Sequence, residues 1–70
     1  MTLDCRGQLC PQPVIELAKA VRSNPVGTVI RIETDDPAAA VDIPAWCRMR
    51  GHAVNVVGTV DGAMVHEVTV

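Results

Sequence analysis

The sequence predicts an α/β two-layer sandwich in which two helices cover one face of a four-stranded mixed sheet. Four short segments alternate between apolar and polar residues and two others follow a helical period, in the order β-α-β-α-β-β. Right-handed crossovers then place both helices on the same side of the sheet. The chain has 70 residues, 49% of them hydrophobic, with no linker, low-complexity tract or repeat, so we expect one domain over residues 1–70.

A short strand and an amphipathic helix begin the chain. Residues 2–5 alternate and are followed by Gly7, which predicts a strand with Leu3 and Cys5 on one face. Beyond the Cys-Pro-Gln-Pro segment, apolar residues recur with helical spacing at Val14, Leu17, Ala18 and Val21. Asn24-Pro25 is expected to end this helix, because proline disfavours helical backbone in the residue before it.

A second strand is predicted over residues 28–34. Ile30 and Ile32 point to one face, and the side chains that alternate with them are Val29, Arg31 and Glu33. This second face combines apolar and charged groups. A solvated surface and a partner site are both open interpretations of it.

A second helix follows the segment Asp35-Asp36-Pro37, which supplies an acidic cap and a proline for the first helical position. Pro44 lacks an N–H, so we expect the helix to be broken or kinked, with Asp42 starting its second piece. The residues predicted to share a buried face are Ile43, Trp46 and Cys47. Gly51 is placed to end the helix in the left-handed conformation.

The last two strands are predicted over residues 54–57 and 64–70, joined by a turn that contains Asp61-Gly62, a strong hairpin signal. Phe and Tyr are absent and Trp46 is the single aromatic residue. The core is therefore expected to consist of Val, Ile, Leu, Ala and Met side chains.

Composition argues against several classes of function. Six basic residues against eight acidic ones give a net charge of −2, and the basic residues are scattered, which argues against direct nucleic-acid binding. No apolar run approaches the ~20 residues that span a bilayer, and Asp4 and Arg6 interrupt the region where a signal peptide would be apolar. We expect a cytoplasmic protein without membrane contact. Three cysteines, an odd count, argue against a disulfide scaffold.

Candidate chemistry concentrates at Cys10. Because Pro11 follows it, the residue is expected to take the extended backbone of a helix N-cap, with its thiol at the positive end of the helix. Pro11 and Pro13 have no N–H, so a free N–H of Gln12 and that of Val14 are expected near the sulfur. A free thiol with a pKa of ~8.5 is about 3% ionised at pH 7, and a fall of about two units would make it about 75% ionised.

The same motif is expected to hold the sulfur in one direction, because a proline on each side of Gln12 fixes the backbone. Arg6, four residues before Cys10 and separated from it by Gly7, is placed to stabilise a thiolate or persulfide anion. The alternative is a small buried hydrophobic cysteine, the commoner environment of a lone thiol. The Cys-Pro-x-Pro helix start argues for the reactive interpretation.

Other candidate groups have simpler interpretations. Cys5 is expected to be a core thiol, with a reversible Cys5–Cys10 disulfide as the alternative. Cys47 is expected in the core rather than in catalysis. His52 and His66 are interpreted as surface or strand residues, and no metal is expected because no cysteine pair has zinc-ligand spacing.

Several motifs together resemble the TusA/SirA/YedF-like family of small sulfur-carrier proteins, and the resemblance extends over almost the whole chain. They are Leu3-Asp4, Gly7, Cys10-Pro11-Gln12-Pro13-Val14, Asp35-Asp36-Pro37, Asp42-Ile43-Pro44, Trp46-Cys47 and Gly51-His52. The family has the same β-α-β-α-β-β sandwich. Its members commonly read Gly-Leu-x-Cys-Pro where this chain reads Gly7-Gln8-Leu9-Cys10-Pro11, a departure that bears on partner choice.

The resemblance implies a sulfur relay. Cys10 would accept a sulfane sulfur from a cysteine desulfurase or rhodanese-like donor, hold it as a persulfide and pass it to a downstream acceptor protein, as in tRNA thiolation and related pathways. No cofactor beyond this covalent persulfide is expected, and we expect a monomer. Two alternatives remain open: a regulatory or protein-interaction module in which Cys10 only caps the helix, and a thiol redox switch that uses Cys5 and Cys10.

Overall fold

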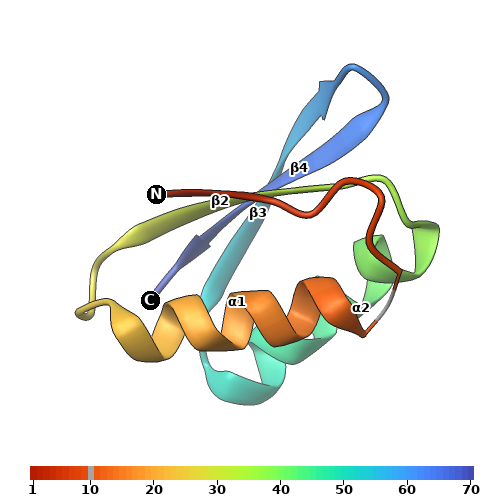
Figure 1. Cartoon of the computed structure of the whole chain (residues 1–70). Helices are drawn as coiled ribbons and strands as arrows, with labels where there is room; N and C mark the ends of the chain where they lie inside the picture. Colours follow the sequence, from red (N-terminus) through yellow and green to blue (C-terminus); the bar gives the residue numbers. More distant parts are fainter. Residues whose placement is uncertain (10) are drawn as a thin grey trace.

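The alternating and helical segments form secondary structure in the predicted order. The computed structural model describes residues 1–9 and 11–70, and its elements are β1 (Thr2–Asp4), α1 (Gln12–Ser23), β2 (Val29–Thr34), α2 (Pro37–Arg50), β3 (Ala53–Val60) and β4 (Ala63–Thr69). The sheet order is β1-β2-β4-β3, with β1 parallel to β2 and the other pairs antiparallel. Both helices cover the same face of this mixed sheet (Figure 1). The predicted fold class is confirmed.

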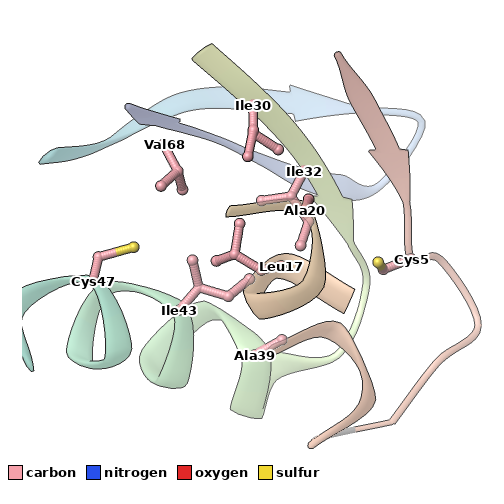
Figure 2. Packing of buried hydrophobic residues seen from close by; sticks show 9 residues of the cluster. All are labelled: Cys5, Leu17, Ala20, Ile30, Ile32, Ala39, Ile43, Cys47 and Val68. Atoms are coloured by element: carbon pink, nitrogen blue, oxygen red, sulfur yellow. The ribbon is translucent and has the colours of Figure 1, made fainter. Parts of the chain in front are cut away.

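The core lies between the sheet and the two helices. Strand register explains its composition, because Ile30 lies opposite Val68 and directly opposed side chains share a face. The buried cluster consists of Cys5, Leu17, Ala20, Ile30, Ile32, Ala39, Ile43, Cys47 and Val68 (Figure 2). Trp46 packs against it while only partly buried. The expected methionines are not part of this cluster, since Met1 and Met49 are exposed and Met64 is half-buried.

Helix α2 is one continuous helix, so the expected break before Pro44 is wrong. Ala39, Ile43 and Cys47 are spaced four residues apart and are all buried, and only an unbroken helix keeps all three on the same core face. The predicted ends of the helix are confirmed. Asp36 caps the helix by accepting the Ala38 N–H, and at the other end Gly51 has a φ of 79°.

The C-terminus of α2 is closed by two hydrogen bonds. The Gly51 N–H donates to the Arg48 carbonyl at 3.4 Å, and the His52 N–H donates to the Cys47 carbonyl at 2.8 Å. This is the pair of bonds of a Schellman motif, for which a residue in the left-handed conformation is required.

The β3–β4 hairpin is longer than predicted. Asp61 and Gly62, with φ of 51° and 80°, form the turn, and both values suit a type I′ hairpin. Strand β3 begins before residue 54 and extends beyond residue 57. A register irregularity between Val56 and Gly58 accompanies the extension, and pairing with β4 continues past it.

The sheet face opposite the helices carries charged groups, as predicted. Arg31 lies opposite Glu67 across β2 and β4, and its Nε is 3.4 Å from the Glu33 carboxylate. In the parts of the chain that the structure describes, no helix is long and apolar enough to cross a membrane.

Candidate functional site

The loop between β1 and α1 carries the predicted site residues. The Cys5 N–H donates to the Glu33 carbonyl at 2.8 Å, which extends the pairing of β1 with β2 by one residue. The Gln8 N–H then donates to the Cys5 carbonyl at 3.2 Å. Cys10 itself lies outside the described residues, so the predicted direction of its thiol remains a prediction.

Gly7 is anchored to the segment before α2. Its N–H donates to both carboxylate oxygens of Asp35, at 2.9 and 3.1 Å. Its φ of 78° is in the left-handed region, which glycine adopts without steric cost. Sequence reasoning missed this contact because it treated the two aspartates as one helix cap. Only Asp36 caps the helix. The signal that the sequence offered was Asp35, an acidic residue that the cap does not need.

Arg6 forms a bidentate ion pair with Asp4 at the end of β1. The Nε and Nη2 groups donate to the two Asp4 oxygens, each at 2.9 Å. The Arg6 hydrogen bonds lower the pKa of Asp4 to about 2, and the same carboxylate raises the pKa of Arg6. Because Asp4 largely neutralises this guanidinium, the pair stabilises the turn after β1 and leaves little positive charge for a sulfur anion.

The start of α1 differs from the prediction. The helix begins at Gln12, and Pro11 occupies the N-cap position with no side-chain cap. The prediction that Cys10 is the N-cap residue is therefore wrong. The Gln12 N–H donates to the Leu9 carbonyl at 2.9 Å, so the prediction of a free Gln12 N–H near the sulfur is wrong. Sequence reasoning missed this hydrogen bond because a preceding carbonyl was not considered as an acceptor.

The residues that flank Cys10 are exposed on both sides. Leu9 is 76% exposed, and Pro11 and Gln12 are also exposed. The Gln12 side chain donates to the Glu16 carboxylate at 2.9 Å, one helical turn further on. Pro13, in contrast, is fully buried and fixes the first turn of α1 to the core. The described residues on both sides of Cys10 therefore form a solvent-facing corner with one buried attachment at Pro13.

The two described thiols are buried. Cys5 is 2% exposed and Cys47 is 0% exposed, and both belong to the core cluster (Figure 2). Burial raises the pKa of both thiols, and nearby Glu16 and Asp4 raise that of Cys5 further. The interpretation of Cys5 and Cys47 as core thiols is confirmed.

An apolar groove of about 260 Å³ lies between the start of α1 and the middle of α2. Its lining residues are Pro11, Val14, Asp42, Ala45, Trp46 and Met49. Pro11 directly follows Cys10 in the chain, so the groove adjoins the cysteine segment. Met49 is 78% exposed, and the groove gives this corner an apolar surface.

The histidines occupy different environments. His52 stacks on Trp46, with ring centroids 5.6 Å apart. His66 is fully buried opposite Ile32 on β4, and neither of its ring nitrogens has a hydrogen-bond partner among the described residues. Burial lowers its pKa. Within residues 1–9 and 11–70, no group of three or more His, Cys, Asp and Glu side chains is arranged to hold a metal ion.

These features define a small α/β protein in which the described residues next to Cys10 are exposed at the start of α1. The sequence matches the family described as Sulfurtransferase TusA over residues 1–70. The chain belongs to this family. A role in sulfur transfer as a sulfur carrier follows from that membership, and it implies interaction with proteins that donate and accept sulfur.

Two similar proteins support this assignment at different levels. A protein of Archaeoglobus fulgidus named "Putative sulfur carrier protein" is 36% identical over 52 residues, which cover 74% of this chain and 71% of that protein. The crystal structure of a SirA-like protein from Desulfitobacterium hafniense has a TM-score of 0.87 and 23% sequence identity, covering 97% of this chain and 93% of the other. The second similarity shows the shared fold.

Proposed function

We propose that the protein carries sulfane sulfur as a persulfide on Cys10 and relays it from a donor protein to an acceptor protein. The observation that carries this proposal is the burial of the other two thiols. Cys5 and Cys47 are 2% and 0% exposed and have raised pKa values, so neither is suited to exchange with a partner. Cys10 is the remaining thiol, and its neighbours in the chain, Leu9 and Pro11, are exposed.

The proposed cycle consists of two thiol exchanges. The Cys10 thiolate attacks the outer sulfur of a persulfide on the donor, a Cys10–sulfur bond forms, and the donor cysteine leaves as a thiolate. A thiolate of the acceptor then attacks the outer sulfur on Cys10 and releases the Cys10 thiolate. Each exchange makes one sulfur–sulfur bond and breaks another. The cycle therefore requires no external oxidant and no metal or organic cofactor.

The start of α1 supports the anion in this proposal. Gln12 and Ile15 donate their N–H groups to carbonyls, and Pro13 has none. The Val14 N–H is the donor of the first turn that we assign to the sulfur, together with the helix dipole. This leaves fewer donors than the sequence predicted, and the expected fall in the thiol pKa rests mainly on the dipole.

In this proposal the remaining predicted site residues hold the loop between β1 and α1 in place. Gly7 ties it to Asp35, and Arg6 fixes its first turn through Asp4. Pro11 and Pro13 limit the backbone on both sides of Gln12. In this proposal the residues before Cys10 are held by the Gly7–Asp35 hydrogen bonds, and those after it by the buried Pro13.

We propose a cysteine desulfurase or a rhodanese-like protein as the donor, and a downstream sulfur acceptor such as a component of tRNA thiolation. Contact is expected to be transient, with the cysteine corner inserted into a cleft of the partner. The exposed Leu9 and the adjoining apolar groove support this mode, because exposed apolar surface would be buried on insertion.

Intact-mass analysis after incubation with a cysteine desulfurase and free cysteine tests the proposal. The native chain should gain the mass of one sulfur atom, and the gain should disappear on treatment with a reducing agent. Cys10→Ser should gain nothing, whereas Cys5→Ser and Cys47→Ser should gain sulfur as the native chain does.

Other outcomes identify the alternatives. A loss of two hydrogens that requires Cys5 and Cys10 would indicate a redox switch. No change in mass would favour an interaction module without sulfur chemistry. Sulfur bound equally well by Cys10→Ser would assign the carrier role to another residue.

A further inference from the structure

Strand β3 lies at an edge of the sheet and is exposed along almost its whole length. It pairs with β4 on one side, and within residues 1–9 and 11–70 no strand pairs with its other side. All of its residues except Val54 are exposed. Figure 1 shows the β3–β4 hairpin extending beyond the two helices. Alternate residues of an edge strand direct backbone N–H and C=O groups away from the sheet, where another strand can pair with them.

The helices leave part of β3 uncovered on the core face of the sheet. Val56 lies opposite His66, and His66 lies opposite Ile32. Directly opposed side chains share a face, so all three belong to the face that the helices cover. Ile32 and His66 are fully buried, whereas Val56 is 61% exposed. The helices therefore do not cover the middle of β3.

Strand β3 lacks the features that usually prevent an edge strand from pairing. Native edge strands are very short or carry charged side chains or proline. The other edge follows this rule, since β1 has three residues and ends in Asp4, which is paired with Arg6. Strand β3 has eight residues, none of them charged and none a proline. Its exposed large hydrophobic side chains are Val56, Val57 and Val60.

Charges at the two ends of β3 favour one kind of partner strand. Arg50 lies just before the strand and Asp61 directly after it, and neither forms an ion pair within the described part of the chain. In an antiparallel pair the start of one strand lies beside the end of the other. A second copy of β3 in this orientation therefore brings Asp61 of each chain towards Arg50 of the other. A parallel arrangement would place like charges side by side.

The irregularity in β3 is compatible with a two-fold arrangement. The register shift falls between Val56 and Gly58, at the middle of the strand, and leaves Val57 without an opposite residue on β4. A two-fold axis at this point places residues 53–56 of each copy beside residues 58–60 of the other. Because the axis lies at the irregularity, both strands bend at the same place, and regular segments pair on either side of it.

We propose that the protein forms a symmetric dimer in which the β3 strands of two copies pair in antiparallel orientation and join the two sheets. A two-fold axis perpendicular to the sheet keeps the helices of both copies on one face. This assembly differs from the monomer expected from the sequence, because the exposure of β3 follows from the arrangement of the helices rather than from a local pattern. The loop that leads to Cys10 follows β1, at the opposite edge, so the interface leaves both sulfur sites accessible.

Sedimentation equilibrium of the full chain in a reducing buffer tests the association. The average mass should rise from that of one chain towards that of two as the protein concentration increases about a hundred-fold. Cys10→Ser should associate in the same way, because the interface involves no disulfide. The mass of a single chain over the whole range would overturn the proposal. A mass that continues to rise beyond two chains would contradict a closed two-fold dimer.

Val56→Lys places a charge near the two-fold axis, where the lysines of the two copies would repel one another. The variant should remain monomeric over the same range, because charge on an edge strand prevents pairing. Val41→Lys is the matched control: Val41 is 69% exposed on α2, and this variant should dimerise as the native chain does. Native circular dichroism spectra show that both variants are folded. Equal dissociation constants for the two variants would refute the assignment to β3.

Asp61→Asn removes the charge at both ends of the strand pair, and Asn-Gly retains the preferred sequence of a type I′ turn. The loss of two exposed ion pairs should raise the dissociation constant of the dimer about five-fold. Added salt should weaken the native dimer more than the variant dimer, because it screens the same charges. A dissociation constant that equals the native value would contradict the antiparallel orientation.

Isotope-filtered NMR on a mixture of labelled and unlabelled chains locates the interface. Contacts between chains should join residues 53–56 of one copy to residues 58–60 of the other, and contacts at the helices alone would overturn the proposal. If the chain stays monomeric and a sulfur donor protein slows hydrogen exchange in β3, the edge binds a different partner and the dimer is refuted. Val56→Lys should still acquire sulfur from a cysteine desulfurase, so failure of the dimer and failure of the proposed function are separate results.

Discussion

The three thiols are expected to react with iodoacetamide at very different rates in the folded protein. Cys5 and Cys47 are 2% and 0% exposed, so alkylation of either requires local or global opening. If opening costs about 5 kcal/mol, the lower limit of the stability of a small domain, the rate falls by roughly three to four orders of magnitude. At pH 7, an ionised fraction of about 75% instead of about 3% would raise the rate at Cys10 only about three-fold above that of a free thiol, because a thiolate becomes a weaker nucleophile as its pKa falls.

The two buried thiols should also differ from one another. Cys5 follows β1, an edge strand of only three residues, and Figure 2 places it at the margin of the core cluster. Cys47 lies within α2, packed between the helix and the sheet. Opening at the edge requires the loss of fewer contacts, so the expected order of rates is Cys10, then Cys5, then Cys47.

Peptide mapping by mass spectrometry over a time course measures the three rates. In denaturant the three thiols should react at similar rates, which controls for intrinsic reactivity. Cys10→Ser should retain only the slow reactions. A native rate at Cys5 or Cys47 within about ten-fold of that at Cys10 would refute the reasoning, because it would show that burial does not protect these thiols.

Three further predictions concern stability. Asp36→Ala removes the cap of α2 and should lower the free energy of unfolding by about 1 kcal/mol in urea denaturation, and an unchanged midpoint would contradict the role of the cap. Leu17→Ala should cost about 2–5 kcal/mol in the same assay, because Leu17 is fully buried, and a loss below 1 kcal/mol would mean that the core collapses around it. Burial lowers the pKa of His66 below the 6.5 of an exposed histidine, so the unfolded chain binds a proton that the folded chain does not, and stability should fall as the pH drops below about 6.5. His66→Leu should lose this part of the pH dependence, measured as the unfolding midpoint between pH 7 and 5, and a native slope in the variant would show that another group titrates.

Local patterns were sufficient to predict the elements. The spacing of Val14, Leu17 and Val21 predicted α1, and Asp61-Gly62 predicted the hairpin turn, because in both cases neighbouring residues determine the backbone. Pro44 misled the prediction for α2. The prediction considered only the hydrogen bond that Pro44 removes from the helix. The burial of Ile43 and Cys47, on both sides of Pro44, keeps the helix continuous.

The candidate site could be predicted only in part, because it depends on contacts between distant segments. The bond from the Gly7 N–H to Asp35 joins residues 28 positions apart, and no local pattern reveals it. Nor does the sequence show that Arg6 pairs with Asp4 rather than remaining available to a sulfur anion. In the sequence His66 has the pattern of an ordinary strand residue. Only the register, which places it opposite Ile32, shows that it lies inside the sandwich.

The ionisation of the Cys10 thiol tests the chemical basis of the sulfur relay most directly. The variant Cys5→Ala/Cys47→Ala leaves Cys10 as the single thiol, and the rise of thiolate absorbance with pH then gives its pKa without contributions from the buried groups. The account predicts a midpoint below ~8.5, the value of a free cysteine. A midpoint at or above that value would contradict it.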